Sequence, residues 1–165
     1  MKNLLLSLFL LGSAFQALAQ ITELPEIKLE AVNYKYLDAA GDQDVALPIK
    51  QLQQKVAEYD IRMADVYADE YDFYTVNFFI PEGKILASYD RDGNLLRTAE
   101  KFKDIALPQA VRDAIGKRFP NWNMTKDVYL VNYHDGGKVK KEYKVLLENG
   151  DKRMRIKTDE KGNFI

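Results

Sequence analysis

The stretch DFYTVNFFIPEGKILASYDRDGNLL, residues 72–96, returns in pattern as KEYKVLLENGDKRMRIKTDEKGNFI, residues 141–165. The two stretches align without a gap at an offset of 69 residues, and their apolar side chains occupy alternate positions. Such alternation is typical of strands with one buried face, and a slip of one residue would expose every apolar side chain. We therefore expect one antiparallel hairpin per stretch, buried through Tyr74, Val76, Phe78, Ile85 and Ala87, and through Tyr143, Val145, Leu147, Met154 and Ile156.

A turn interrupts each stretch at the same place. Pro81-Glu82-Gly83 separates the two halves of the first stretch, and Asn149-Gly150 separates those of the second. Asn-Gly between two alternating runs is a strong hairpin signal, because both residues tolerate a positive φ angle.

Each stretch closes on a segment that could be taken for a calcium loop, YDRDGNLL at 89–96 and TDEKGNFI at 158–165. A calcium loop of the EF-hand type needs a Glu six residues after its Gly, but Ala99 stands there. The second copy replaces Asp92 by Lys161, yet it keeps an Asp, the Gly and the Asn. These are the residues that a tight turn requires, so we predict a turn and no metal site.

A helical pattern precedes each hairpin. Both patterns begin at Ala-Leu-Pro, residues 46–48 and 106–108, where Pro suits the first turn of a helix. Apolar residues then recur on one helical face. They are Leu52, Val56 and Tyr59 in the first helix, and Val111, Ile115 and Phe119 in the second.

These features predict an α+β fold of two tandem units, each a helix packed on an antiparallel β-meander. The units are expected over residues 46–100 and 101–165, and their strands could form one continuous sheet. A short strand is expected after each helix, over 64–68 and 126–130.

The second unit resembles the PepSY-like, β-lactamase-inhibitor-like domains exported by Bacteroidetes-type bacteria. The resemblance rests on LPQAVRDAIGKRFPNW (107–122), EYKVLLENGD (142–151) and the closing TDEKGNFI, and it extends over about residues 46–165. It implies tandem helix-on-sheet units in a periplasmic or secreted protein. True β-lactamase inhibitor proteins present a concave sheet to an enzyme and contain disulfides, whereas this chain has no Cys and no motif that carries over their contact residues.

The N-terminus is typical of an exported protein. Residues 1–19 combine Lys2, an apolar run and Ala17-Leu18-Ala19, so we predict a signal peptide cleaved after Ala19. No apolar run is long enough for a transmembrane helix. Residues 20–45 would form an extension with a strand over 26–37 and a loop from Asp38.

Charge is unevenly distributed along the chain. Residues 20–100 carry 8 Lys/Arg against 16 Asp/Glu, and residues 101–165 carry 15 against 9. The two halves could attract each other or be solvated, or the basic half could meet an anionic partner.

No motif indicates catalysis. The only histidine, His134, lies in the segment NYHDGGK and is expected in an exposed loop, which excludes multi-histidine zinc sites. Glycine-rich phosphate loops and G-x-S-x-G are absent. Asp69, Glu70 and Asp72 are interpreted as a solvated acidic loop. We expect no catalytic residue, cofactor or metal, and a nucleotidyltransferase has no supporting motif.

The candidate binding residues are basic. If the second hairpin buries its apolar residues, its opposite face carries Lys144, Arg153, Arg155 and Lys157, and these cations should be hydrated or matched by an anionic partner. The corresponding residues of the first hairpin are Thr75, Lys84, Leu86 and Ser88, so the basic face is expected in the second unit alone.

We therefore expect an exported, non-catalytic binding or inhibitory module that acts through its sheet face or the cleft between its units. The partner would be an acidic exported protein or an anionic envelope component, and not nucleic acid. The alternative is a periplasmic small-ligand or lipid carrier, with Tyr74, Phe78 and Tyr89 lining a pocket. The sequence leaves the oligomeric state open.

Overall fold

The computed structural model describes residues 33–41 and 45–165, so the predicted signal peptide lies outside the described residues. The described elements are, in order, α2 (Tyr34–Ala40), α3 (Leu47–Glu58), η1 (Ile61–Met63), β1 (Phe73–Ile80), β2 (Gly83–Asp90), β3 (Leu95–Lys103), α4 (Gln109–Arg118), β4 (Asn123–His134), β5 (Lys138–Asn149) and β6 (Lys152–Thr158).

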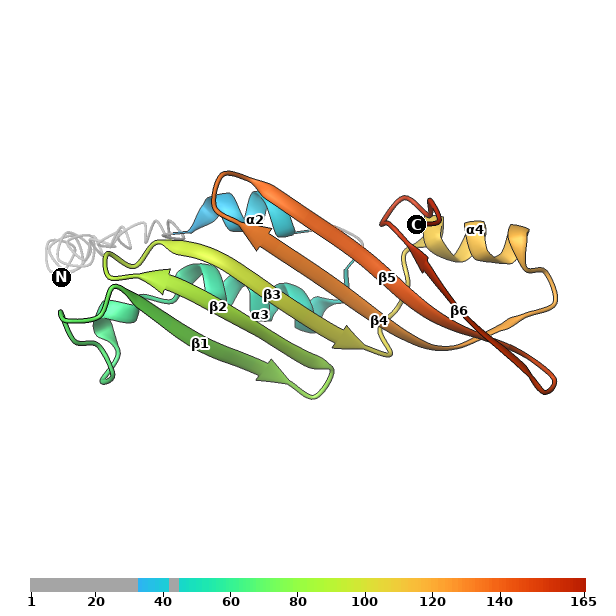
Figure 1. The fold of residues 1–165 in the computed structure, drawn as a ribbon, viewed down its shortest axis with the longest axis horizontal. Helices are drawn as coiled ribbons and strands as arrows, with labels where there is room; N and C mark the ends of the chain where they lie inside the picture. The colour runs from blue at the N-terminus through green and yellow to red at the C-terminus, as the bar shows by residue number, and fades with distance from the viewer. Residues whose placement is uncertain (1–32, 42–44) are drawn as a thin grey trace, which may run out of the picture.

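The strands form one six-stranded antiparallel sheet in the order of the chain, β1-β2-β3-β4-β5-β6. Helices α2 and α3 lie behind the sheet in Figure 1, and α4 lies near the end of β6. Strands β3 and β4 pair from Arg97 with His134 to Lys103 with Val128, which joins the two predicted units. The α+β fold and the continuous sheet are confirmed. The unit boundaries stay a prediction, because the sheet crosses them without a break.

The two hairpins have the same register. Tyr74 pairs with Tyr89 in β1–β2, and Tyr143 pairs with Thr158 in β5–β6, at the offset of the sequence repeat. Ile85, Ala87, Tyr143, Val145 and Leu147 are almost fully buried, whereas Val76, Phe78, Met154 and Ile156 are half-buried because they lie on the edge strands. The predicted hairpins and their buried face are confirmed.

The hairpin turns lie within one residue of their predicted positions. Ile80 pairs with Gly83, and Asn149 pairs with Lys152, so each turn has two residues. Gly150 takes a positive φ angle of 56° in the second turn. At Gly83 the requirement is space, because an added Cβ would lie 2.1 Å from the backbone oxygen of Lys101.

Two strand predictions are wrong. Residues 64–68 form a loop, because Tyr67 stacks on Tyr74 at 5.4 Å and the Tyr74 hydroxyl hydrogen-bonds the backbone of Ala68. The strand expected over 26–37 is wrong from Tyr34 onward, where α2 begins. Residues 126–130 are strand, but within the longer β4.

The N-terminal errors have a simple cause. Tyr36 and Ala40 are four residues apart and are both fully buried, so helix α2 gains a buried face that the alternating sequence concealed. The predicted loop from Asp38 is wrong at its start, because Asp38 still belongs to α2, and residues 26–32 and 42–44 lie outside the described part.

One hydrophobic core extends across both predicted units. Leu52 and Val56 of α3 and Val111 and Ile115 of α4 are buried, as predicted, and Tyr59 and Phe119 pack beside the core just after their helices. The largest fully buried side chains are Tyr36, Tyr89, Phe102, Tyr129, Tyr133 and Tyr143. The helices and the core thus occupy one face of the sheet.

Candidate functional site

The opposite face of the sheet, termed the open face, consists of the side chains that alternate with the buried ones. In Figure 1 this face is turned toward the viewer, with α2 and α3 behind it. The open face is strongly basic. Its cations are Lys84, Arg97, Lys101, Lys103, Lys126, Lys138, Lys140, Lys144, Arg153, Arg155 and Lys157, and its carboxylates among the paired residues of the described strands are Asp90, Glu142 and Glu148.

The four predicted residues lie together on this face over β5 and β6. Lys144 is directly opposite Lys157, Arg155 is opposite Leu146, and Arg153 is opposite Glu148. The four side chains therefore lie on one face of the sheet, as the alternation of the sequence predicts. Their role in binding stays a prediction.

Glu142, which the sequence alone did not reveal as part of this face, lies among the lysines. Its carboxylate is 3.5 Å from Lys140, 3.6 Å from Lys144 and 3.7 Å from Lys157. Partial burial would raise the pKa of Glu142, but Lys157, Lys144 and Lys140 outweigh that effect and lower it. The chain itself thus supplies an anion for Lys144 and Lys157. Glu142 shares the sequence parity of Lys144, and this signal could have revealed it.

Arg153 is matched in the same way. Its Nε lies 2.9 Å from Glu148, directly across the hairpin. Glu142 and Glu148 therefore pair with three of the four cations, whose side chains stay 43–75% exposed to water. Arg155 and Lys126 differ, because neither forms an ion pair within residues 33–41 and 45–165.

A shallow hollow of about 260 Å³ lies between these two cations. Its floor includes Val128 and Leu146, which are half-buried outward residues, and Lys126, Lys144 and Arg155 surround it. An apolar floor beside a guanidinium suits an apolar side chain next to a carboxylate, because arginine binds carboxylates through two parallel hydrogen bonds.

The basic residues of the open face continue beyond the second hairpin onto β2 and β3. Lys84, Lys101 and Lys103 surround a second hollow of about 390 Å³ beside Phe79, which is 76% exposed. The aligned hairpins could not reveal this, because Lys101 and Lys103 belong to β3, beyond the repeat.

His134 also lies on the open face. It is the last residue of β4, opposite Arg97 on one side and Lys138 on the other. It is exposed, as expected, but it belongs to a strand and not to the loop that was predicted.

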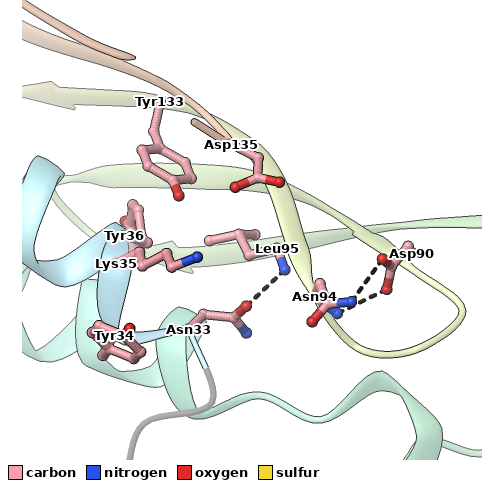
Figure 2. A pocket seen from close by; sticks show the side chains of 9 residues that line it. All are labelled: Asn33, Tyr34, Lys35, Tyr36, Asp90, Asn94, Leu95, Tyr133 and Asp135. Carbon is pink, nitrogen blue, oxygen red and sulfur yellow. Dashed lines mark hydrogen bonds between the residues drawn. The ribbon is translucent and has the colours of Figure 1, made fainter. Parts of the chain in front are cut away.

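A polar cavity of about 320 Å³ lies at the end of the sheet, beside the first closing turn (Figure 2). Figure 2 shows Asn33 reaching this turn, and its Oδ1 accepts a hydrogen bond from the backbone N–H of Leu95 at 2.7 Å. The Asp90 carboxylate is already used, because it accepts from the N–H of Asp92 at 2.9 Å and from Asn94 at 2.8 and 2.9 Å. The Asp90 carboxylate and the Asn33 side chain that line this cavity therefore hold the closing turn in place.

The second closing turn has the same hydrogen bonds. Asp159 accepts from the N–H of Lys161 at 2.9 Å and from Asn163 at 2.8 Å through both its backbone and its side chain. The predicted turns are confirmed. No cluster of three metal-ligating residues occurs within the described residues.

The aromatic residues of the carrier hypothesis form packing contacts. Phe78 and Tyr89 both contact the Tyr59 ring, at 5.2 and 5.7 Å between centroids. The fully buried Tyr89 hydroxyl donates to the Val56 carbonyl at 2.8 Å, and Tyr74 is bonded to Ala68. These contacts give the three predicted residues a role in the core.

Glu100 is a deeply buried carboxyl that the sequence did not reveal. It accepts hydrogen bonds from Tyr36 at 2.7 Å, from Gln53 at 2.9 Å and from Thr98 at 2.9 Å. Burial raises its pKa, although these hydrogen bonds oppose the shift. The contacts connect α2 and α3 to β3, so Glu100 stabilises the helix–sheet packing. Asp69, Glu70 and Asp72 are exposed, as expected of a solvated loop.

No helix of the described chain is long and apolar enough to cross a membrane.

Comparison with known proteins gives a similar solved structure. No family model matches the chain, and no curated protein matches it. A crystal structure of a BLIP-like protein from Bacteroides fragilis is 20% identical, with a TM-score of 0.36, and the similarity covers 78% of this chain and 88% of that chain. The β-lactamase-inhibitor-like and PepSY-like resemblance rests on the sequence motifs alone, and the export stays a prediction.

Proposed function

We propose that this protein is an exported, non-catalytic binding module whose open face binds an acidic protein. The observation that carries the proposal is the gathering of basic side chains on a sheet face that the described helices leave uncovered. Like charges on one face repel each other, and an anionic partner would relieve that repulsion.

The apolar hollows support a protein as the partner. An exposed ion pair contributes only about 0–1 kcal/mol, so charge alone gives weak binding. Burial of apolar surface adds about 25 cal/mol per Å², and both hollows offer such surface, at Val128 and Leu146 and at Phe79. A partner that presents carboxylates beside apolar side chains fits this mixture better than a purely polar polysaccharide does.

The partner would share the compartment of this protein. The predicted signal peptide supports an acidic protein that is itself exported, in the periplasm or outside the cell.

Binding to two synthetic polypeptides tests the proposal. Poly-L-glutamate supplies carboxylates alone, and a random glutamate–tyrosine copolymer supplies carboxylates beside aromatic rings. We expect the copolymer to bind more tightly, and both affinities to fall as salt is added. A variant with Lys144→Gln, Arg153→Gln, Arg155→Gln and Lys157→Gln should lose at least about tenfold in affinity, because it removes four cations from the open face. A tenfold loss corresponds to about 1.4 kcal/mol of binding free energy.

The matched control neutralises four exposed lysines away from the open face, at Lys35, Lys55, Lys117 and Lys161. It changes the net charge equally, and it should bind both polymers as the wild type does. Equal losses in the two variants would contradict the proposal, because binding would then depend on net charge. Binding of an anionic polysaccharide that exceeds binding of the copolymer would contradict the choice of a protein partner.

A further inference from the structure

The two edges of the sheet differ sharply in charge. Strand β6, at one edge, has the sequence KRMRIKT, which is basic at four positions. Strand β1, at the other edge, has the sequence FYTVNFFI and carries no charge. An edge strand exposes unpaired backbone N–H and C=O groups, and proteins commonly protect such edges with charges or prolines inside the strand. Strand β1 lacks both.

Strand β1 is also chemically symmetric about Val76. Thr75 and Asn77 are the polar neighbours on its two sides, Tyr74 and Phe78 are the aromatic residues two positions away, and Phe73 and Phe79 are three positions away. The last two point away from the core and are 68% and 76% exposed. When two identical strands pair antiparallel about a central residue, each position before the centre lies opposite the equivalent position after it. The symmetry of β1 therefore places chemically similar residues opposite each other.

We propose that β1 is a dimerisation edge, at which two copies of this chain pair antiparallel about a two-fold axis at Val76. In this register Phe73 lies opposite the partner copy's Phe79, and Thr75 lies opposite the partner copy's Asn77. Residues directly opposite on antiparallel strands share a face, and the odd-numbered residues of β1 all lie on the open face. The pairing therefore places each Phe73 beside a Phe79 of the other copy on the open face, in an aromatic cross-strand contact, and satisfies the edge backbone.

The charges favour β1 over β6 for this contact. Two β6 edges would bring Lys152, Arg153, Arg155 and Lys157 of each copy together. At β1 the like charges lie only at the ends, where Glu70 of one copy would approach Glu82 of the other. Salt should therefore strengthen the dimer by screening these carboxylates. That is opposite to the effect expected for binding at the open face.

The dimer would place both open faces on the same side of one continuous sheet. Two basic faces joined at their least charged strand form a bivalent surface, which raises avidity without any new contact. The dimer itself does not depend on what the open face binds.

Sedimentation equilibrium of the purified chain over a concentration series tests the proposal. We expect a monomer–dimer equilibrium that shifts toward dimer as salt is added. The variant Thr75→Lys/Asn77→Lys places like charges opposite each other and should be monomeric, and Thr75→Glu/Asn77→Glu should be monomeric as well. The control Ala99→Lys/Asn132→Lys adds the same charge at an exposed, directly opposed pair between β3 and β4, and it should dimerise as the wild type does.

An equimolar mixture of the lysine and glutamate variants provides the decisive result. Each lysine then lies opposite a glutamate, so the mixture should recover the dimer that neither variant forms alone. Circular dichroism establishes that each variant is folded. A wild type that stays monomeric, a mixture of folded variants that stays monomeric, or assembly beyond the dimer would each overturn the proposal.

Discussion

Asp90 and Asp159 occupy equivalent positions in the two closing turns, and each carboxylate accepts three hydrogen bonds from the residues that follow it. An aspartate with its lone pairs committed to backbone and amide donors holds a turn and does not need a cation. In the sequence, the first closing turn resembled a calcium loop. The second closing turn argued against that interpretation, because Lys161 replaces Asp92 there.

Replacing Asp159 tests this interpretation. Asp159→Ala removes its three hydrogen bonds, which are worth about 1 kcal/mol each at most in this exposed turn, so we expect a modest loss in the free energy of unfolding. Urea denaturation measures the loss. Added calcium should leave the stability of the wild type unchanged, and stabilisation by calcium would contradict the turn interpretation.

Glu100 should make stability depend on pH. Burial raises its pKa above the ordinary value of 4.5, so the folded state binds the proton more tightly than the unfolded chain does. The contribution is therefore full below about pH 4.5 and is lost as pH rises through the folded pKa. Glu100→Gln should flatten this part of the stability profile.

The comparison needs a control, because Asp127 acts in the same direction. Burial raises the pKa of Asp127 to about 6. The dependence of stability on pH that Asp127 causes therefore remains in the Glu100→Gln variant. The exposed substitution Glu58→Gln changes the net charge equally and should keep the full wild-type slope. If Glu100→Gln and Glu58→Gln gave the same urea midpoints from pH 4 to 8, Glu100 would not titrate as described.

At the scale of elements, the second closing turn also positions α4. Gly162 has a φ angle of 83°, and a Cβ there would lie 2.6 Å from the backbone oxygen of Ala110 in α4. Gly150 also has a positive φ, of 56°, but a Cβ there meets no atom within 4 Å. The two glycines therefore separate the effect of φ from the effect of close packing.

We predict that Gly162→Ala destabilises the protein clearly more than Gly150→Ala does. Strain at φ costs about 1 kcal/mol in both, and only the first change also pushes the turn away from α4. Urea denaturation of the two variants measures the difference. Equal losses would show that the turn does not pack against the helix as described.

The hairpins were predictable from the sequence because the alternation is local and occurs twice. Tyr74 and Tyr143 mark the same register position in both copies. Helix α2 was not predictable in this way, because Tyr36 is buried only through contacts with distant residues, including Tyr133 and Glu100. The strand prediction for residues 64–68 was wrong for the same reason, because Tyr67 packs on the ring of Tyr74 and does not pair in a strand.

The binding face was partly predictable. Alternation alone placed Lys144, Arg155 and their neighbours on one side of a sheet. The ion pair of Glu142 with Lys144 lies within β5 and follows from the same alternation. The extension of the face to Lys101 depends on which strands lie side by side. Strand order is a property of the whole fold, and the repeat did not reveal that β3 and β4 would pair.

At the scale of the whole molecule, the faces of the sheet separate the charges more clearly than the halves of the chain do. The acidic residues of the first half lie largely in exposed loops, such as Asp65, Asp69 and Glu70, while the cations of both units gather on the open face. A concentrated positive face steers anionic partners and sets their orientation. Dimerisation through β1 would double this face on one side of the molecule.

A methyl NMR titration with the glutamate–tyrosine copolymer tests the central claim most directly, because it identifies the surface that is bound. We predict shifts at Val128, Leu130 and Leu146, whose side chains lie on the open face. Leu47 and Val66 are 66% and 70% exposed but lie in α3 and in the 64–72 loop, and their methyl signals should not move. Shifts confined to Leu47 and Val66, or no shift at the open face at saturating copolymer, would contradict the account.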